Sequence, residues 1–125
     1  MLVERDAAAN LAVRDLKAAK KFYEGTLGLA PVGREGRHLI AYRSGASTLL
    51  VYKSQYAGSN KATAVTWNVG AELEAIVRAL KAKGVAFEHY DLPGMTRKGD
   101  VHVAAGMKAA WFKDPDGNIL NIVNG

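Results

Sequence analysis

The side chains that could carry acid–base or metal chemistry in this chain are three histidines and a few acidic residues. The candidates are His38, His89, His102, Asp6, Asp91 and Asp100. No two of the histidines are three or four residues apart, the spacing that places two metal ligands on one helix face. We therefore expect most of them to be surface residues. His102 is kept as a candidate acid–base catalyst, because an imidazole can titrate near neutral pH.

The composition is that of one ordinary globular domain. The chain has 125 residues, of which 49% are apolar and 23% are charged, enough to form one hydrophobic core. It has no cysteine, which excludes disulfides and thiol nucleophiles and fits the reducing cytoplasm. The charged residues Glu4, Arg5 and Asp6 lie where a secretory signal would need an apolar run, and no later segment approaches membrane-spanning length. We therefore expect a cytoplasmic protein with no membrane partner.

The formal net charge of +5 raises the question of a nucleic-acid partner. The lysines do not cluster into a nucleic-acid motif. Lys17, Lys20 and Lys21 belong to one expected helix, and Lys81 and Lys83 belong to another, in each case off the apolar stripe. We interpret them as solvated helix faces and expect no nucleic acid as partner. The charge is still compatible with a preference for small anionic ligands.

A strand followed by a helix occurs twice along the chain. Alternating apolar residues at positions 9, 11 and 13 predict a strand, and Asp15 is a suitable N-cap for a helix that ends near Gly28. Val65 begins the same alternation 56 positions later (65 − 9), and a second helical stripe follows it up to Gly84. Gly28 and Gly84 are also 56 positions apart (84 − 28). The two helices therefore end in register.

A strand hairpin also occurs in both halves. Phe112 and Ile122 are ten positions apart (122 − 112), as are Tyr42 and Tyr52 (52 − 42), and the turn DPDGN replaces SGAS. Proline fixes φ while glycine and asparagine tolerate positive φ, so DPDGN predicts a tight turn between antiparallel strands. The sequence therefore predicts two copies of one βαβββ unit.

These patterns predict an α+β fold in which two βαβββ modules pair into one curved mixed sheet. We expect a single domain over residues 1–125, with module 1 at about 6–54 and module 2 at about 62–124. Because a unit this short cannot bury both faces of its own sheet, the two copies should form one structure. Helices are expected on the outer face, which leaves the other face as a cup. The glycine-rich segment between Ala86 and Lys108 breaks the repeat, and we expect it to form a lid over one end of the cup.

The stretch RDLKAAKKFYEGTLGL, together with the turn DPDGN, resembles the vicinal-oxygen-chelate superfamily. This superfamily includes glyoxalase I, the extradiol dioxygenases, and the fosfomycin- and bleomycin-resistance proteins. The resemblance covers nearly the whole chain and implies a cup of two βαβββ modules, usually in a homodimer. It is specific for the fold and not for any one activity.

The resemblance also implies where a divalent metal would be held. Metal-dependent members use up to four side chains, which map here to Ala8, Val51, Ala64 and Asn121. Divalent metals need several converging imidazole or carboxylate donors, and alanine and valine supply none. Asn121 offers only a neutral carbonyl oxygen. We therefore expect a member without the usual metal ligands and without a cofactor.

The face opposite the helices is expected to hold a ligand. Period-2 alternation places Ala8, Asn10 and Ala12 on this face in the first strand, and Leu49, Val51 and Lys53 in the strand that closes module 1. In module 2 the same face is expected to carry Ala64, Thr66 and Asn68, and in the last strand Ile119, Asn121 and Val123. Trp111 and Tyr42 are candidate aromatic walls, although core packing is the commoner role for such residues. The residues expected to contact a ligand are Asn10, Tyr42, Lys53, Thr66, Asn68, Trp111 and Asn121.

The favoured function is the binding of a small organic molecule in a metal-free cup, without catalysis. Lys53 with Arg97 or Lys98 could attract a carboxylate, whereas cationic bleomycin would meet the wrong charge. One alternative is a lyase, isomerase or dioxygenase of glyoxalase type that uses a displaced metal or an acid–base histidine such as His102; as an enzyme it would be lactoylglutathione-lyase-like. Another is an interaction module whose cup is packed shut.

Overall fold

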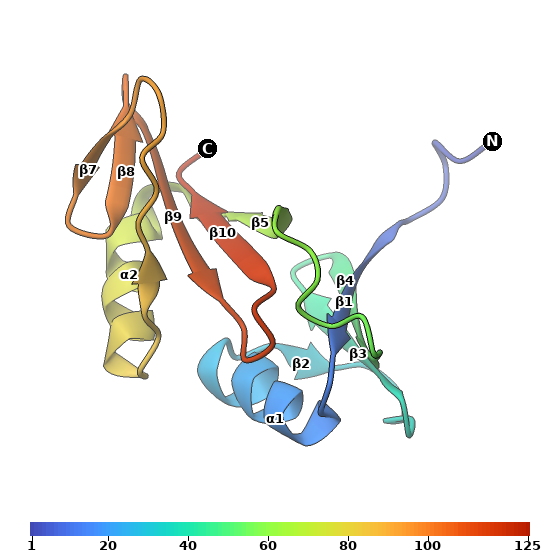
Figure 1. The fold of residues 1–125 in the computed structure, drawn as a ribbon. Coiled ribbons are helices and arrows are strands. Elements are labelled where there is room, and N and C mark those ends of the chain that lie inside the picture. Colours follow the sequence, from blue (N-terminus) through green and yellow to red (C-terminus); the bar gives the residue numbers. More distant parts are fainter. The chain divides into compact units, whose positions relative to one another are not determined.

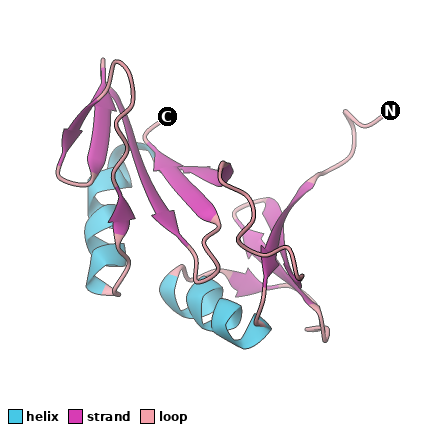
Figure 2. Ribbon diagram, viewed as in Figure 1, coloured by secondary structure: helices cyan, strands magenta, loops and turns pink.

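The computed structural model describes all residues, 1–125, and divides into two compact units. The first unit comprises Met1–Asn60 and Pro115–Asn118, and the second comprises Lys61–Asp114 and Ile119–Gly125. Figure 1 shows the order of the elements along the chain, and Figure 2 distinguishes helices from strands. Each unit contains a mixed sheet with a helix, which confirms the predicted α+β fold with two βαβββ modules.

The first unit consists of a four-stranded sheet in the order β1-β4-β3-β2 and one helical segment. Its elements are β1 (Ala8–Val13), α1 (Leu16–Lys20), the π-helical turn η1 (Lys21–Thr26), β2 (Ala30–Pro31), β3 (Leu39–Ser44) and β4 (Ser47–Lys53). Asp15 caps α1 as predicted, because its side chain accepts a hydrogen bond from the backbone nitrogen of Lys17 at 2.9 Å. Ala19 of α1 and Tyr23 of η1 are buried. The rings of Tyr23 and Tyr42 are stacked, with their centroids 6.0 Å apart.

The second unit has a six-stranded sheet in the order β5-β10-β9-β8-β7, with β6 also paired to β9. Its elements are β5 (Thr63–Asn68), the 3-10 turn η2 (Gly70–Glu72), α2 (Leu73–Ala82), β6 (Phe87–Glu88), β7 (Thr96–Lys98), β8 (Val101–Ala104), β9 (Met107–Lys113) and β10 (Ile119–Val123). Leu73, Val77 and Leu80 lie on one face of α2 and are buried, as the helical spacing predicts. No helix in either unit is long and apolar enough to cross a bilayer.

The pairing of β4 corrects one of the predicted faces. Leu49 is paired with Ala9 and Tyr42, and Val51 is paired with Leu11 and Ile40. Apart from Ala9 these residues are buried, so they lie on the face covered by the helical segment and not in a cup. The open face of β4 instead carries Thr48, Leu50 and Tyr52.

The same register explains the error. From Tyr42 to its partner Leu49 the chain advances seven positions (49 − 42), whereas from Phe112 to its partner Leu120 it advances eight (120 − 112). Between the last strand pairs, the SGAS hairpin has a loop of two residues (47 − 44 − 1) and the DPDGN hairpin has a loop of five (119 − 113 − 1), which is an odd difference of three. Counting across both turns with a constant spacing shifts β4 by one residue, which turns every side chain to the other face.

The segment from Ala86 to Lys108 also differs from the prediction. We expected a lid, but β7 and β8 form an antiparallel hairpin whose second strand pairs with β9. From Thr96 to Ala104 the segment thus extends the sheet of the second unit. Its glycines mark tight turns: Gly94, Gly99 and Gly106 all have positive φ. The backbone groups that a lid would leave unpaired are satisfied here by the strand ladder.

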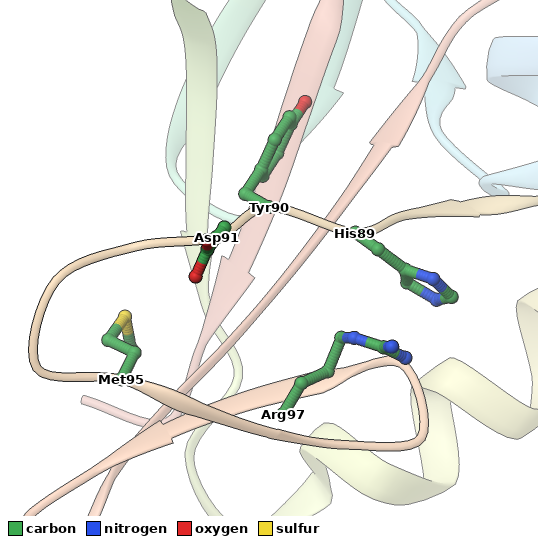
Figure 3. Close-up of a pocket in the computed structure, with 5 residues that line it drawn as sticks. All are labelled: His89, Tyr90, Asp91, Met95 and Arg97. Carbon is green, nitrogen blue, oxygen red and sulfur yellow. The ribbon is translucent and has the colours of Figure 1, made fainter.

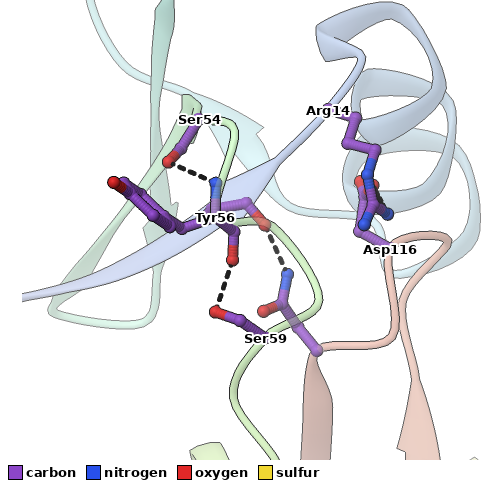
Figure 4. A network of polar contacts seen from close by, with 7 residues as sticks. Arg14, Ser54, Tyr56, Ser59 and Asp116 are labelled. Carbon is purple, nitrogen blue, oxygen red and sulfur yellow. Dashed lines mark hydrogen bonds and ion pairs between the residues drawn. The ribbon is translucent and has the colours of Figure 1, made fainter.

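The DPDGN turn closes the β9–β10 hairpin as predicted, with Lys113 paired to Ile119. Within the first unit this turn packs on β1 and on the loop that follows β4. The Asn118 side-chain amide donates to the Ala12 carbonyl at 2.8 Å, and Arg14 lies 3.4 Å from the Asp116 carboxylate. Figure 4 shows Arg14 beside Asp116, together with the loop hydrogen bonds of Ser54, Tyr56 and Ser59. The turn therefore ties residues far apart in the sequence into one unit.

Candidate ligand-binding site

Three aromatic rings meet on the face of the second sheet that lies opposite α2. Trp111 is in β9, His102 is in the adjacent strand β8, and Tyr90 follows β6. The ring centroids of His102 and Trp111 are 4.9 Å apart and those of Tyr90 and Trp111 are 5.4 Å apart, both edge to face. Trp111 therefore belongs to the open face, and its neighbour Phe112 belongs to the core. The sequence alone left the face of Trp111 undecided, because the stretch around it is apolar at every position.

His102 is the most deeply buried ionisable side chain of this cluster, with 1% of its surface exposed. Its Nε2 accepts a hydrogen bond from the backbone nitrogen of Tyr90 at 3.0 Å. This bond leaves Nε2 without a proton, so the neutral ring carries its proton on Nδ1. A proton cannot be added at Nε2 unless the bond to Tyr90 breaks. The arrangement favours a structural role for His102 and disfavours the acid–base role that we considered from the sequence.

Two buried polar atoms of the cluster have no hydrogen-bond partner. They are the hydroxyl oxygen of Tyr90 and the Nδ1 of His102. Burial also raises the pKa of the Tyr90 hydroxyl, so this group stays protonated at neutral pH. Buried polar groups are normally paired, and each exception requires an explanation such as a water or a ligand.

A cavity of about 260 Å³ lies directly against this cluster. Its lining residues are Lys61, Ala62, Thr63, Tyr90, Leu92, Trp111 and Ile119. All of them belong to the second unit. The Trp111 indole N–H donates to the Thr63 hydroxyl at 3.2 Å, which fixes the plane of the indole ring at the cavity wall. An apolar, aromatic wall with few polar groups is typical of a small-molecule site.

The amides that we expected to contact a ligand in the second unit are already paired. Thr66 and Asn121 are neighbours across β5 and β10, and the Thr66 hydroxyl donates to the Asn121 side-chain oxygen at 3.0 Å. The Asn121 amide nitrogen donates to the carbonyl of Ala110 at 3.0 Å. Asn68 accepts a hydrogen bond from the backbone nitrogen of Gly70. Thr66, Asn68 and Asn121 lie on the open face as predicted, but none of them lines the cavity beside Trp111.

The expected ligand contacts of the first unit lie in different surroundings. Asn10 is exposed on the open face of β1, where its amide is 3.4 Å from the Ala8 carbonyl. Tyr42 is fully buried on the helix-covered face, and its hydroxyl donates to the Glu24 carboxylate at 2.8 Å. Burial and this carboxylate raise the pKa of Tyr42. Lys53 pairs with Val13, so its register also places it on the side covered by the helix. The placement of Tyr42 and Lys53 in a cup was therefore wrong.

The residues at the family's usual metal positions do not fit a divalent ion. Ala8 and Ala64 have no donor atom, and the corrected register replaces Val51 with Leu50, which has none either. The side chain of Asn121 already accepts one hydrogen bond and donates another. Nowhere in residues 1–125 do three His, Asp or Glu side chains gather as a metal site would require.

A second cavity, of about 310 Å³, is formed by residues of the segment that follows β6 and by β7. It is lined by His89, Tyr90, Asp91, Met95 and Arg97, which Figure 3 shows. In that view the His89 ring and the Arg97 guanidinium lie at the same end, and Asp91 points toward the other end. Arg97 donates to the Gly99 carbonyl at 2.7 Å. Its neighbour Lys98 is exposed on β7 and lines neither cavity.

Asp100 anchors this part of the chain to α2. One carboxylate oxygen lies 2.7 Å from the Lys81 ammonium and the other lies 2.8 Å from Nε2 of His89. Hydrogen bonds from Lys81 and then from His89 lower the pKa of Asp100 below its usual value of 3.8. A carboxyl with a lowered pKa stabilises the fold above its unfolded pKa, and the effect disappears as the pH falls through the folded pKa.

We therefore expect Asp100→Asn to lower the free energy of unfolding at pH 7 and to lose this effect as the pH falls through the lowered pKa of Asp100. Urea denaturation at several pH values measures the difference. Asp91→Asn is the matched control, because Asp91 is exposed and makes no ion pair in the structure. A loss of stability that is the same at every pH would contradict the electrostatic explanation.

The cavity residues that sequence reasoning missed are Lys61, Ala62, Thr63, Tyr90 and Leu92. Tyr90 and Leu92 lie in the segment that we interpreted as a lid, and Lys61 lies in the connection between the modules. A signal was present for Thr63, because it begins the strand that contains the expected Thr66 and Asn68. Nothing in the sequence pattern indicates that the segment after β6 turns back along Trp111.

Comparison with known proteins agrees with this architecture. The family model described as "Glyoxalase/Bleomycin resistance protein/Dioxygenase superfamily" matches residues 6–122. No curated protein sequence matches the chain. Several solved structures share the fold at low sequence identity, and at this level they inform on the fold alone.

Three of these structures illustrate the range of proteins that share the fold. The lactoylglutathione lyase from Agrobacterium tumefaciens has a TM-score of 0.69 and 20% identity, over 96% of this chain and 92% of that one. The fosfomycin resistance protein FosX from Mesorhizobium loti has a TM-score of 0.71 and 12% identity, over 98% of this chain and 93% of that one. The oxidase ChaP-H2 has a TM-score of 0.71 and 21% identity, over 98% of this chain and 94% of that one.

Proposed function

Because the chain belongs to the glyoxalase/bleomycin resistance protein/dioxygenase superfamily, we propose that it acts through its open sheet face and binds a small, planar organic molecule beside Trp111. The observation that carries the proposal is the cavity of about 260 Å³ against the Tyr90–His102–Trp111 cluster. An aromatic molecule in this cavity would contact the Trp111 and Tyr90 rings, and offset or edge-to-face contacts of this kind contribute about 0.5–1.5 kcal/mol per ring pair.

The unpartnered Tyr90 hydroxyl supports the same proposal. A buried hydroxyl without a hydrogen bond costs about 1–3 kcal/mol. Tyr90 lines the cavity, so an acceptor on the ligand would supply the missing partner once the buried hydroxyl turns toward the cavity. The buried Nδ1 of His102 is a second unsatisfied donor of the cluster, although His102 does not line the cavity.

We propose binding without catalysis and place the enzymatic alternative second. A glyoxalase-type reaction needs a Lewis acid or an acid–base group at the reacting atoms. The usual ligand positions offer no metal donors beyond Asn121, and Nε2 of His102 is held by the backbone of Tyr90. The related lyase and oxidase show that the fold supports catalysis elsewhere, and their activities are not transferred to this chain.

The proposal includes a homodimer in the cytoplasm. Apolar side chains on the open face of the first sheet support self-association, since Leu39 is 42% exposed and Tyr52 is 36% exposed. The lack of cysteine fits a reducing compartment. Four lysines, Lys20, Lys81, Lys108 and Lys113, are already in ion pairs with acidic side chains, which supports the absence of a nucleic-acid partner.

The proposal predicts that planar molecules of one or two rings raise the melting temperature of the protein. A suitable panel contains indole, quinoline and 2-naphthamide. A ligand at about 100 times its Kd stabilises the folded protein by about 2.7 kcal/mol, which corresponds to about 10 °C for a domain of this size. The measurement is a thermal-shift titration of the wild type and of the variant Trp111→Leu, which keeps an apolar side chain but removes the indole.

The control for this experiment is Tyr56→Leu, which removes an aromatic side chain that is 69% exposed and lines neither cavity. We expect the shift to be kept in Tyr56→Leu and to be abolished in Trp111→Leu. Equal shifts in both variants would place binding elsewhere, and no shift from any member of the panel would contradict the proposed function.

A further inference from the structure

We propose that the ligand of the cavity beside Trp111 is a small aromatic anion whose carboxylate is bound by Lys61. This inference rests on the proposed function and specifies the chemical class of ligand. Among the seven residues that line the cavity, Lys61 carries the only charge. Its side chain is exposed and makes no ion pair or hydrogen bond within the structure. A cation at the rim of an apolar cavity is available for an acidic group of the ligand.

The charges around the cavity leave Lys61 uncompensated. Lys113, which pairs with the lining residue Ile119 across the β9–β10 hairpin, has its ammonium 3.1 Å from the Glu88 carboxylate. The carboxylate of Glu88 is thus already bound to Lys113 and does not compensate Lys61. The chain as a whole has a net charge of +5, which favours the approach of anions. The electrostatics therefore favour a negatively charged ligand over a neutral or cationic one.

The unpaired hydroxyl of Tyr90 also matches an anion. Tyr90 lines the cavity, and its buried hydroxyl would donate a hydrogen bond to the ligand once the side chain turns toward the cavity. No buried side-chain acceptor other than the Tyr90 oxygen itself is unpaired. A carboxylate supplies acceptors only, and hydrogen bonds to an ionised acceptor are stronger than those to a neutral one.

The size of the cavity limits the rest of the ligand. Its volume of about 260 Å³ lies below the range of about 300–1,000 Å³ that holds drug-sized molecules. Leu92, Ile119 and the Trp111 ring provide the apolar wall. A molecule of one or two fused rings with one acidic group satisfies the volume, the apolar wall and the single cation together.

Isothermal titration calorimetry with three matched probes tests the inference. The probes are 2-naphthoate, 2-naphthamide and 2-naphthylmethylammonium, which share one ring system and differ in charge. At low salt we expect 2-naphthoate to bind about fivefold more tightly than 2-naphthamide, the effect of one exposed ion pair. Raising the salt concentration should reduce this preference, because the pair is screened.

The variant Lys61→Gln should remove the preference for 2-naphthoate over 2-naphthamide. Lys17→Gln is the control, since it makes the same change of charge at an exposed position on α1. If the amide binds as tightly as the carboxylate, or if Lys61→Gln changes nothing, the anionic class is overturned while the proposed function stands. If none of the three probes binds to the wild type, the proposed function fails as well.

Discussion

Replacement of Gly58 by alanine is expected to destabilise the protein much more than replacement of Gly28 by alanine. Both glycines have nearly the same backbone conformation, with φ of +76° and +75°. A side chain in this region costs about 1–2 kcal/mol in either position. A Cβ at Gly58 would also lie 2.5 Å from the backbone oxygen of Asp116, whereas a Cβ at Gly28 would have no neighbour within 4 Å. The steric overlap adds about 1–3 kcal/mol at Gly58 only.

Urea denaturation followed by circular dichroism measures the free energy of unfolding that each of the two variants loses. The Gly28 variant is the matched control, because it isolates the cost of the backbone conformation from that of the contact. The contact joins the loop after β4 to the DPDGN turn, so the experiment measures how much the packing of this turn contributes to the first unit. Equal losses in the two variants would mean that the turn does not pack on Gly58 in solution.

Replacement of Phe112 by alanine is expected to cost about 3–5 kcal/mol of the free energy of unfolding. Phe112 is 1% exposed and packs edge to face on Phe87 at 5.6 Å. Trp111→Ala should cost less than half as much, although tryptophan is larger, because Trp111 is only half-buried on the open face. The two neighbours thus report on the two faces of β9.

This pair of variants tests the strand register of the second unit directly. A shift of one residue would exchange the environments of Trp111 and Phe112. If Trp111→Ala is the more destabilising change, the assignment of Trp111 to the open face is wrong, and the candidate site loses its aromatic wall.

The parts of the fold that the sequence predicted are those set by local chemistry. Asp15 caps α1, the stripe of Leu73, Val77 and Leu80 is buried, and DPDGN closes a hairpin, as expected. Each of these features depends on residues within one or two turns of each other. Such features can be predicted from spacing and residue type alone.

The parts that were missed depend on long-range pairing. The face of β4 depended on a hairpin turn that is three residues shorter than its counterpart (5 − 2), and this odd difference changed Tyr42 from a ligand contact to a core residue. The segment after β6 brings Tyr90 to Trp111 across the sheet, and no periodicity in the sequence encodes that contact. The candidate cavity therefore shares only Trp111 with the predicted ligand contacts.

The most direct test of the proposed site uses the two tryptophans of the chain. Trp111 lines the cavity, whereas Trp67 pairs with the buried Ile122 on the opposite face of the sheet. Each indole N–H gives its own signal in a proton–nitrogen correlation spectrum. In a titration with neutral 2-naphthamide, we predict a saturable shift of the Trp111 signal and an unchanged Trp67 signal. If the Trp111 signal stays fixed, or if the Trp67 signal alone moves, the protein does not bind planar molecules at this site.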